Sequence, residues 1–196
     1  MSMERLDFEH PAWLQEHKRI LESELFFSAE EQIRAANALA RLNVEHRTGG
    51  PFGCVIVNSQ SGAVVGFGVN SVVARGSLFH AETVAIWEAQ RRLGHYDLGA
   101  DPKVSYSLAC NAAPCTMCLG AVIWSGVRIL VTGASTADVE VITGFDEGPQ
   151  PKDLEDELRI RRIKWIPGVL SEECRSVLQL YRRNGGQVYN GGRGFR

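Results

Sequence analysis

The first third of the chain alternates apolar and polar residues with a helical period. Ser28 followed by Glu31 has the spacing of a capping box, which predicts that a helix begins there. The apolar residues that follow recur at spacings of three and four and predict an amphipathic helix of about 18 residues: Ile33, Ala36, Ala40 and Val44. The Gly-Gly-Pro sequence at 49–51 should end this helix. An earlier segment, residues 11–25, is expected to be either a helix or an extended N-terminal appendage.

The pattern then changes to that of an α/β sheet. Two apolar runs, residues 54–57 and 63–67, flank a polar turn and predict a β-hairpin. Further helices are expected at 80–93, 115–125, 153–163 and from 171, and further strands at 104–109, 127–131 and 163–166. We expect residues 111–114 to interrupt the strand before them, because proline and asparagine break strands. Strands alternating with helices imply an α/β fold, and the hairpin makes its sheet mixed.

Length and composition set limits on this picture. The chain has 196 residues, of which 44% are hydrophobic, so we expect one main domain (residues 26–185), with an N-terminal appendage (1–25) and a glycine-rich tail (186–196). A net charge of −2 argues against a protein held to nucleic acid by excess Lys and Arg. No apolar run reaches the roughly 20 residues of a membrane span, and the N-terminus lacks a secretory signal. These features favour a cytoplasmic protein without membrane partners.

The five cysteines limit which kinds of disulfide or metal site the chain can form. An odd number of cysteines in a chain without an export signal argues against a disulfide framework. Cys54, Cys110 and Cys174 stand alone, and we expect them to be small buried hydrophobic residues. The other two cysteines form a C-x-x-C pair.

Two short motifs carry candidate chemistry: a His-Ala-Glu run that begins at His80, and a Pro-Cys-Thr-Met-Cys run that contains Cys115 and Cys118. Residues i and i+3 share a helix face, so both cysteines can reach one ion. Imidazole and thiolate suit Zn²⁺, and three protein ligands leave a position for water, as is typical of catalytic zinc. Zinc lowers the pKa of bound water to roughly 7 and so provides hydroxide. Glu82 is placed to shuttle protons from that hydroxide to the substrate.

Each element of this constellation has a simpler interpretation when taken alone. His80 alone would be a core histidine, Glu82 a solvated helix charge, and the C-x-x-C pair a redox site or half of a zinc knuckle. However, the sequence contains no second C-x-x-C, and the other four histidines show no ligand spacing. The combination therefore predicts catalytic zinc.

The H-x-E…P-C-x-x-C pattern is the mark of zinc-dependent nucleobase deaminases. Together with the preceding helix and hairpin, it resembles the cytidine deaminase superfamily over roughly residues 28–165. Gly-Gly-Pro-Phe-Gly (49–53), Ala-Val-Ile-Trp (121–124) and Gly-Phe-Asp-Glu (144–147) are similar to bacterial guanine deaminases, and residues 137–149 resemble the subgroup that also accepts ammeline. The resemblance implies a three-layer α/β/α fold with a mixed five-stranded sheet, helices on both faces, zinc at two helix N-termini, and a homodimer.

The resemblance likewise makes His80, Cys115 and Cys118 the zinc ligands and Glu82 the proton shuttle. It also implies which residues contact the substrate. Asn70, Ala81 and Phe145 match positions that contact the base, Asn70 through its amide. Phe145 would stack on the flat ring, although a core phenylalanine is an alternative. Glu147 matches a second catalytic carboxylate that receives the amino and ring N–H groups, with Asp146 as the alternative.

The tail aromatics and Trp124 each have two possible roles. Tyr189 and Phe195 lie in the glycine-rich tail, and in related guanine deaminases the C-terminus covers an active site. The tail is therefore either a lid or a frayed end. Trp124 is expected either in the wall of the core or stacked on the substrate.

The sequence thus predicts zinc-dependent hydrolytic deamination of free guanine to xanthine and ammonia. Alternatives with the same chemistry are deamination of ammeline, cytosine or guanosine, or of adenosine in transfer RNA. A locally basic stretch keeps the last of these open: Arg159, Arg161, Arg162 and Lys164. A non-catalytic zinc-binding interaction module is the alternative from a different class. The presence of Glu82 argues against it, since a proton shuttle adds nothing to metal binding.

Overall fold

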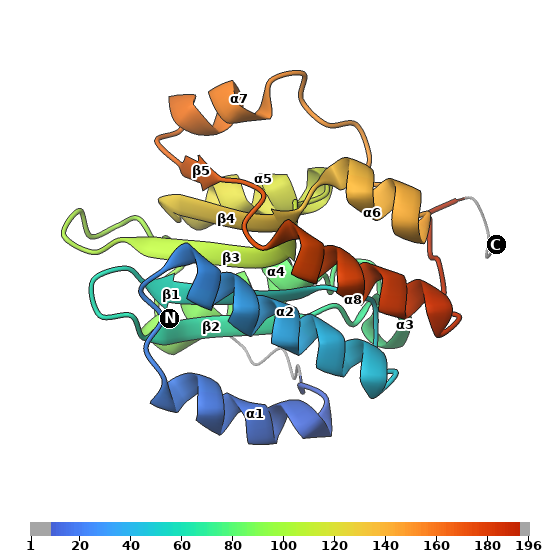
Figure 1. Ribbon diagram of the computed structural model, residues 1–196. Coiled ribbons are helices and arrows are strands. Elements are labelled where there is room, and N and C mark those ends of the chain that lie inside the picture. Colours follow the sequence, from blue (N-terminus) through green and yellow to red (C-terminus); the bar gives the residue numbers. More distant parts are fainter. Residues whose placement is uncertain (1–8, 193–196) are drawn as a thin grey trace.

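The computed structural model describes residues 9–192; residues 1–8 and 193–196, including Phe195, lie outside this description. Helices cover both faces of a mixed five-stranded sheet, which confirms the expected α/β class (Figure 1). The strands are β1 (Gly53–Asn58), β2 (Val64–Val69), β3 (Tyr106–Ala112), β4 (Ile129–Ala134) and β5 (Lys164–Ile166). The helices are α1 (Ala12–Ser23), α2 (Ala29–Glu45), α3 (Val72–Arg75), α4 (Ala81–Leu93), α5 (Thr116–Ser125), α6 (Thr136–Thr143), α7 (Leu154–Ile160) and α8 (Ser171–Arg183).

The strand order is β2-β1-β3-β4-β5. β1 is antiparallel to both of its neighbours, whereas β3, β4 and β5 are parallel. Parallel neighbours need a crossover, and α5 provides it between β3 and β4. Figure 1 shows α2 and α8 on one face of the sheet and α4 and α5 on the other.

Side chains that alternate along the strands build a separate core on each face. On β1, Val55 and Val57 belong to the core under α2 and α8, while Cys54 and Ile56 belong to the core under α4 and α5. Because both faces are covered, the central strands are apolar without interruption. Cys54, Cys110 and Cys174 are free and buried in these cores, as expected.

Local signals account for the positions of several helix ends. The capping box before α2 is confirmed: the Glu31 amide donates to Ser28 Oγ at 3.1 Å, and the Ser28 amide donates to the Glu31 carboxylate at 2.9 Å. α6, which the sequence analysis did not identify, begins with the same device, formed by Ser135 and Asp138. α3 was also not expected, and it is a single turn.

The expected interruption at residues 111–114 is wrong in part, because β3 continues through Asn111 to Ala112. A strand tolerates this fully buried asparagine because its carboxamide is satisfied. Asn111 Oδ1 accepts from the Gly53 amide at 3.0 Å, and its Nδ2 donates to the Pro51 carbonyl at 3.0 Å. These bonds hold the loop before β1 against the end of β3.

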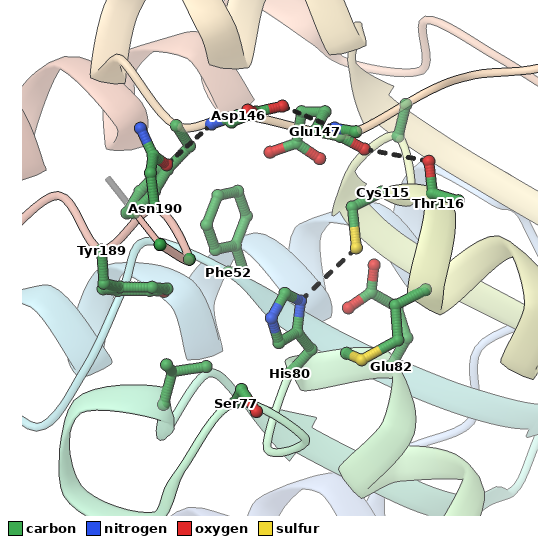
Figure 2. A pocket seen from close by; sticks show the side chains of 17 residues that line it. Phe52, Ser77, His80, Glu82, Cys115, Thr116, Asp146, Glu147, Tyr189 and Asn190 are labelled. Carbon is green, nitrogen blue, oxygen red and sulfur yellow. Dashed lines mark hydrogen bonds between the residues drawn. The ribbon is translucent and has the colours of Figure 1, made fainter. Parts of the chain in front are cut away.

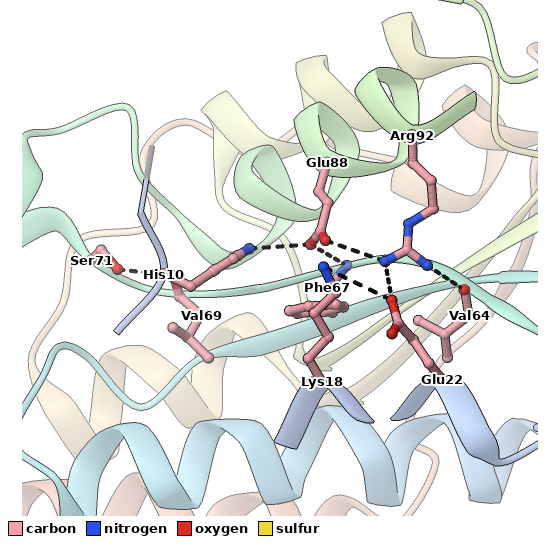
Figure 3. A network of polar contacts seen from close by, with 9 residues as sticks. All are labelled: His10, Lys18, Glu22, Val64, Phe67, Val69, Ser71, Glu88 and Arg92. Carbon is pink, nitrogen blue, oxygen red and sulfur yellow. Dashed lines mark hydrogen bonds and ion pairs between the residues drawn. The ribbon is translucent and has the colours of Figure 1, made fainter. Parts of the chain in front are cut away.

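α1 is tied to the sheet by apolar and polar contacts. Leu14 and Leu21 belong to the same core as α2. Figure 3 shows the polar contacts that converge on Glu88, whose side chain is 1% exposed and accepts from the Phe67 amide at 3.3 Å. His10 Nε2 lies 3.2 Å from the Glu88 carboxylate. Arg92 forms ion pairs with both Glu88 and Glu22, and Glu22 belongs to α1. The N-terminal segment is therefore anchored to α4 and β2.

No helix within residues 9–192 has the length and apolar character that a bilayer crossing requires.

Candidate active site

Two helix N-termini place the three candidate metal ligands side by side. His80 is the N-cap residue of α4 and Cys115 is the N-cap residue of α5, while Cys118 lies in the first turn of α5. Neither cap residue uses its side chain to cap its helix, so both side chains are available for other partners. His80 Nδ1 and Cys115 Sγ are 3.6 Å apart (Figure 2). The ligand atoms of all three residues lie within 4.8 Å of one another.

This donor set fits zinc. One imidazole nitrogen and two sulfurs are preferred ligands of Zn²⁺, and two ligand atoms of a tetrahedral zinc ion are about 3.3–3.8 Å apart. The distance between His80 and Cys115 already falls in that range. Since residues 9–192 contribute three ligands to this cluster rather than four, the arrangement matches a catalytic zinc site better than a structural one.

The electrostatics of the three candidate ligands prepare Cys115 for metal binding, whereas the hydrogen bond to Cys115 and burial hold the pKa of Cys118 well above its usual value. The hydrogen bond from Cys118 lowers the pKa of Cys115 to about 4, and the hydrogen bond with His80 acts in the same direction. The thiolate is the form of cysteine that binds metal. The helix dipoles of α4 and α5 also place partial positive charge at this end of the sheet.

Two buried carboxylates border the same cavity. Glu82 is 5% exposed and Glu147 is 7% exposed. Burial, followed by the negative charge of Cys115, raises the pKa of Glu82 above its usual range and that of Glu147 to about 8. Asp146, the alternative second carboxylate, is exposed, and its carboxylate accepts from the Gly148 amide at 2.9 Å. Both residues line the cavity, but only Glu147 is buried there, with its carboxylate pointing into the cavity (Figure 2).

Aromatic side chains form the wall opposite the triad. The cavity has a volume of about 700 Å³. Phe52, Phe145 and Tyr189 all line it, and the Phe145 ring centroid is 5.6 Å from that of Phe52 and 4.7 Å from that of Tyr189. Phe145 also stacks on Tyr181 at 5.9 Å, so it contributes to the core as well as to the cavity. A flat, aromatic heterocycle suits such a wall.

Asn70 lies behind Tyr189 rather than on the cavity surface. It is 1% exposed, and its Oδ1 accepts from the amides of Gly50 and Val72, each at 3.3 Å, and from the Tyr189 hydroxyl at 2.7 Å. Its Nδ2 has no hydrogen-bond partner among the described residues. The carboxamide is thus held with its amino group as the donor that remains available. Ala81, also predicted to contact the substrate, is fully buried in the first turn of α4.

The glycine-rich tail has a defined position up to residue 192. Tyr189 and Asn190 line the cavity together with the two glycines that follow them. Asn190 Oδ1 accepts from the Asp146 amide at 2.9 Å (Figure 2). Its Nδ2 donates to the Gly144 carbonyl at 3.0 Å. The tail is therefore fixed to the loop that carries Glu147. Sequence reasoning did not identify Asn190, because only its folded position relates it to this loop.

The expectation for Trp124 is wrong. This residue lies on the outer face of α5 and is 85% exposed, so it is neither a core wall nor a substrate contact in this chain. The helix carries no charged residue along its length.

Comparisons with known proteins agree with the site. The family model described as the cytidine and deoxycytidylate deaminase zinc-binding region matches residues 28–134. The matched region contains the triad and Glu82, and it ends before Glu147. A guanine deaminase of Bacillus subtilis (strain 168) is 33% identical over 154 residues, which cover 78% of this chain and 93% of that protein.

Other relatives include a second guanine deaminase and a tRNA-specific adenosine deaminase. The solved structure of a guanine deaminase from Nitrosomonas europaea has a TM-score of 0.83 and 35% identity, covering 93% of this chain and 99% of that one. A tRNA-specific adenosine deaminase of Buchnera aphidicola subsp. Schizaphis graminum is 31% identical over 135 residues, which cover 68% of this chain and 81% of that protein.

Proposed function

Because the chain belongs to the cytidine and deoxycytidylate deaminase family and is a deaminase, we propose that it hydrolyses free guanine to xanthine and ammonia with zinc as its metal. One observation carries the choice of substrate: the cavity that adjoins the His/Cys/Cys triad contains a second buried carboxylate, Glu147, in addition to Glu82. The similarity to guanine deaminases supports the same choice.

In this proposal, His80, Cys115 and Cys118 hold the metal. When bound, zinc supplies the Lewis acidity that makes water a nucleophile at neutral pH. The low pKa of Cys115 and the positive ends of two helices favour the anionic ligand set that such an ion needs.

Glu82 moves the protons in this reaction. Hydrolysis of guanine forms a bond from the water oxygen to C2 and breaks the bond from C2 to the amino nitrogen, which leaves as ammonia. The carboxylate of Glu82 takes a proton from the attacking water and passes it to the substrate. Its burial beside the triad keeps this proton from exchanging with bulk water.

Glu147 orients the substrate from the other side. Guanine presents an amino group and an adjacent ring N–H, and a carboxylate can accept a hydrogen bond from each of them. Phe52 and Phe145 contact the faces of the ring. Asn70, which lies behind Tyr189, remains a predicted contact to the ring edge through its Nδ2, which has no hydrogen-bond partner within residues 9–192. Ala81 remains a predicted substrate contact at the start of α4. The aromatic wall and the two carboxylates together select a flat base with donors on one edge.

Deamination of adenosine in transfer RNA is the second candidate, since such enzymes are also similar to this chain. It needs a basic surface for phosphates. In the basic stretch near α7, Arg159 pairs with Asp156 and Arg161 pairs with Glu157, so much of its charge is neutralised locally. Residues 189–192 of the tail line part of the cavity, which leaves less of its wall for a polynucleotide to contact. Both features favour a small free base.

A second copy of the chain is the proposed partner. α5 presents a charge-free outer face with the exposed side chain of Trp124, and a large exposed aromatic residue of this kind is typical of an interface. Light scattering should give twice the mass of the chain, and a monomer mass would exclude the homodimer.

Ammonia release from purified, zinc-loaded protein tests the function. Guanine, ammeline, cytosine, guanosine, adenine and a transfer RNA with adenosine at its wobble position should be compared at equal concentration. We expect the highest kcat/KM with guanine. A higher value with the RNA substrate would replace the proposal by the second candidate.

A further inference from the structure

The N-terminus of α5 is capped from outside the helix. The first amide groups of a helix have no partner within it, and the N-cap residue Cys115 does not use its side chain to cap them. Instead, the Thr116 amide donates to the backbone carbonyl of Glu147 at 3.0 Å, across 31 residues of sequence. The loop with the second carboxylate is thus hydrogen-bonded to the helix that carries two of the candidate metal ligands.

Side chains reinforce this attachment on both sides of Cys115. The Thr116 hydroxyl donates to the Pro149 carbonyl at 2.9 Å and lies 3.3 Å from the Glu147 carbonyl oxygen. The side-chain amide of Gln150 donates through Nε2 to the Pro114 carbonyl at 3.2 Å, and Nε2 also lies 3.3 Å from the Glu147 carbonyl oxygen.

A glycine lets the loop that carries Glu147 approach Thr116 closely. Gly148 has a φ of +75°, which favours glycine, and a Cβ at this position would lie 2.9 Å from Thr116 Oγ1. The loop can therefore pass directly over the Thr116 hydroxyl only because residue 148 lacks a side chain.

We propose that Thr116 is a positioning residue that sets the distance between the Glu147 carboxylate and the metal triad. The hydrogen bonds described above hold residue 147 by its backbone, and its carboxylate points from there into the cavity (Figure 2). Any shift of this backbone moves the carboxylate, and a misplacement of about 1 Å can cost a catalyst on the order of 100-fold. The inference rests on the proposed role of Glu147 and extends it to the residue that holds Glu147 in place.

Thr116→Val removes the hydroxyl while keeping the shape of the side chain, and Thr116→Ser restores a hydroxyl. Thr136→Val is the matched control, because Thr136 is the first residue of α6 as Thr116 is of α5. All variants are made in the full chain, and zinc content and thermal unfolding are measured for each. We expect Thr116→Val to lower kcat/KM with guanine 5- to 30-fold at unchanged zinc content, whereas the serine and control variants stay within twofold of the wild type.

A double-mutant cycle separates positioning from a general structural effect. If Thr116 acts through Glu147, Thr116→Val should reduce activity less than twofold further in a Glu147→Gln background. Equal losses in both backgrounds would overturn the inference. Wild-type protein that releases no ammonia from guanine would instead contradict the proposed function, and the cycle is then run with the heterocycle that is deaminated.

A measurement without turnover completes the test. Hydrogen exchange of the peptide spanning residues 144–152 in the zinc-free protein should be several-fold faster in Thr116→Val and unchanged in Thr136→Val. Unchanged exchange in Thr116→Val would show that its hydroxyl does not fix the loop, and would overturn the inference.

Discussion

The hydroxyl of Tyr189 donates a 2.7 Å hydrogen bond to Oδ1 of Asn70, although 119 residues separate the two in sequence. The contact depends on the loop before β1, because a Cβ on Gly50 would lie 2.6 Å from that hydroxyl. It joins the C-terminal tail to the residue predicted to recognise the base edge. The tail therefore helps to orient the Asn70 side chain as well as lining the cavity.

Removing only this hydroxyl should weaken substrate binding. Tyr189→Phe keeps the ring that packs on Phe145, but it leaves Asn70 Oδ1 with the two longer bonds from backbone amides. A hydrogen bond of this kind contributes about 0.5–1.5 kcal/mol, so we expect a roughly three- to tenfold higher KM for guanine with kcat little changed. Steady-state kinetics measure both values. A lower kcat at constant KM would argue against this role.

Deleting residues 186–196 should impair catalysis more than that single substitution. The truncation removes Tyr189 and Asn190, and with them the bonds from Asn190 to Asp146 and Gly144. The cavity would open to water and the Glu147 loop would lose a contact. We expect a lower kcat together with a higher KM, and kinetics equal to those of the full chain would exclude a lid.

The capping box of α6 should make part of the stability dependent on pH. The hydrogen bond from the Ser135 hydroxyl lowers the pKa of Asp138 below its usual 3.8. A lowered pKa in the folded state contributes stability at pH values above the unfolded pKa, and this contribution is lost as pH falls through the folded pKa.

Asp138→Asn should therefore lower the free energy of unfolding at pH 7, and the difference from the wild type should shrink below about pH 4. Urea unfolding at several pH values measures this difference, with Glu140→Gln on the same helix as the control. A difference that stays constant from pH 7 to pH 3 would contradict the account.

Metal removal should make the ligand Cys115 reactive toward alkylation and leave the buried cysteines unreactive. Cys54, Cys110 and Cys174 are buried, and burial raises the pKa of Cys174 to about 12, so all three should resist alkylation until the protein unfolds. Cys115 is partly exposed and has a lowered pKa, so it should react first once a chelator has removed zinc. Mass spectrometry of alkylated peptides distinguishes these sites. Equal labelling of Cys115 with and without zinc would count against its role as a ligand.

Much of the site could be predicted because its signals are local. His80 and Cys115 are each followed by a helix, and short motifs specify both, so their placement at two helix N-termini follows from sequence. The start of α6 could also have been predicted, because Ser135 and Asp138 have the spacing of a capping box.

Other features depend on contacts between distant segments. The strand through Asn111 is stable only because Gly53 and Pro51 satisfy its buried carboxamide. The bonds of Tyr189 to Asn70 and of Thr116 to Pro149 likewise join segments whose proximity no local pattern encodes. These contacts arise from the packing of the whole fold, and only the structure reveals them.

We propose that this chain uses Glu82 beside a His/Cys/Cys-bound zinc ion to deaminate guanine, and the kinetics of Glu82→Gln are the decisive test. The measurement is kcat for ammonia release from guanine by wild-type and variant proteins of equal zinc content. We expect one zinc ion per chain in both proteins and a kcat roughly 10²–10⁴-fold lower in the variant, which is the contribution of a positioned proton-transfer group. A fully zinc-loaded Glu82→Gln protein with wild-type turnover would contradict it.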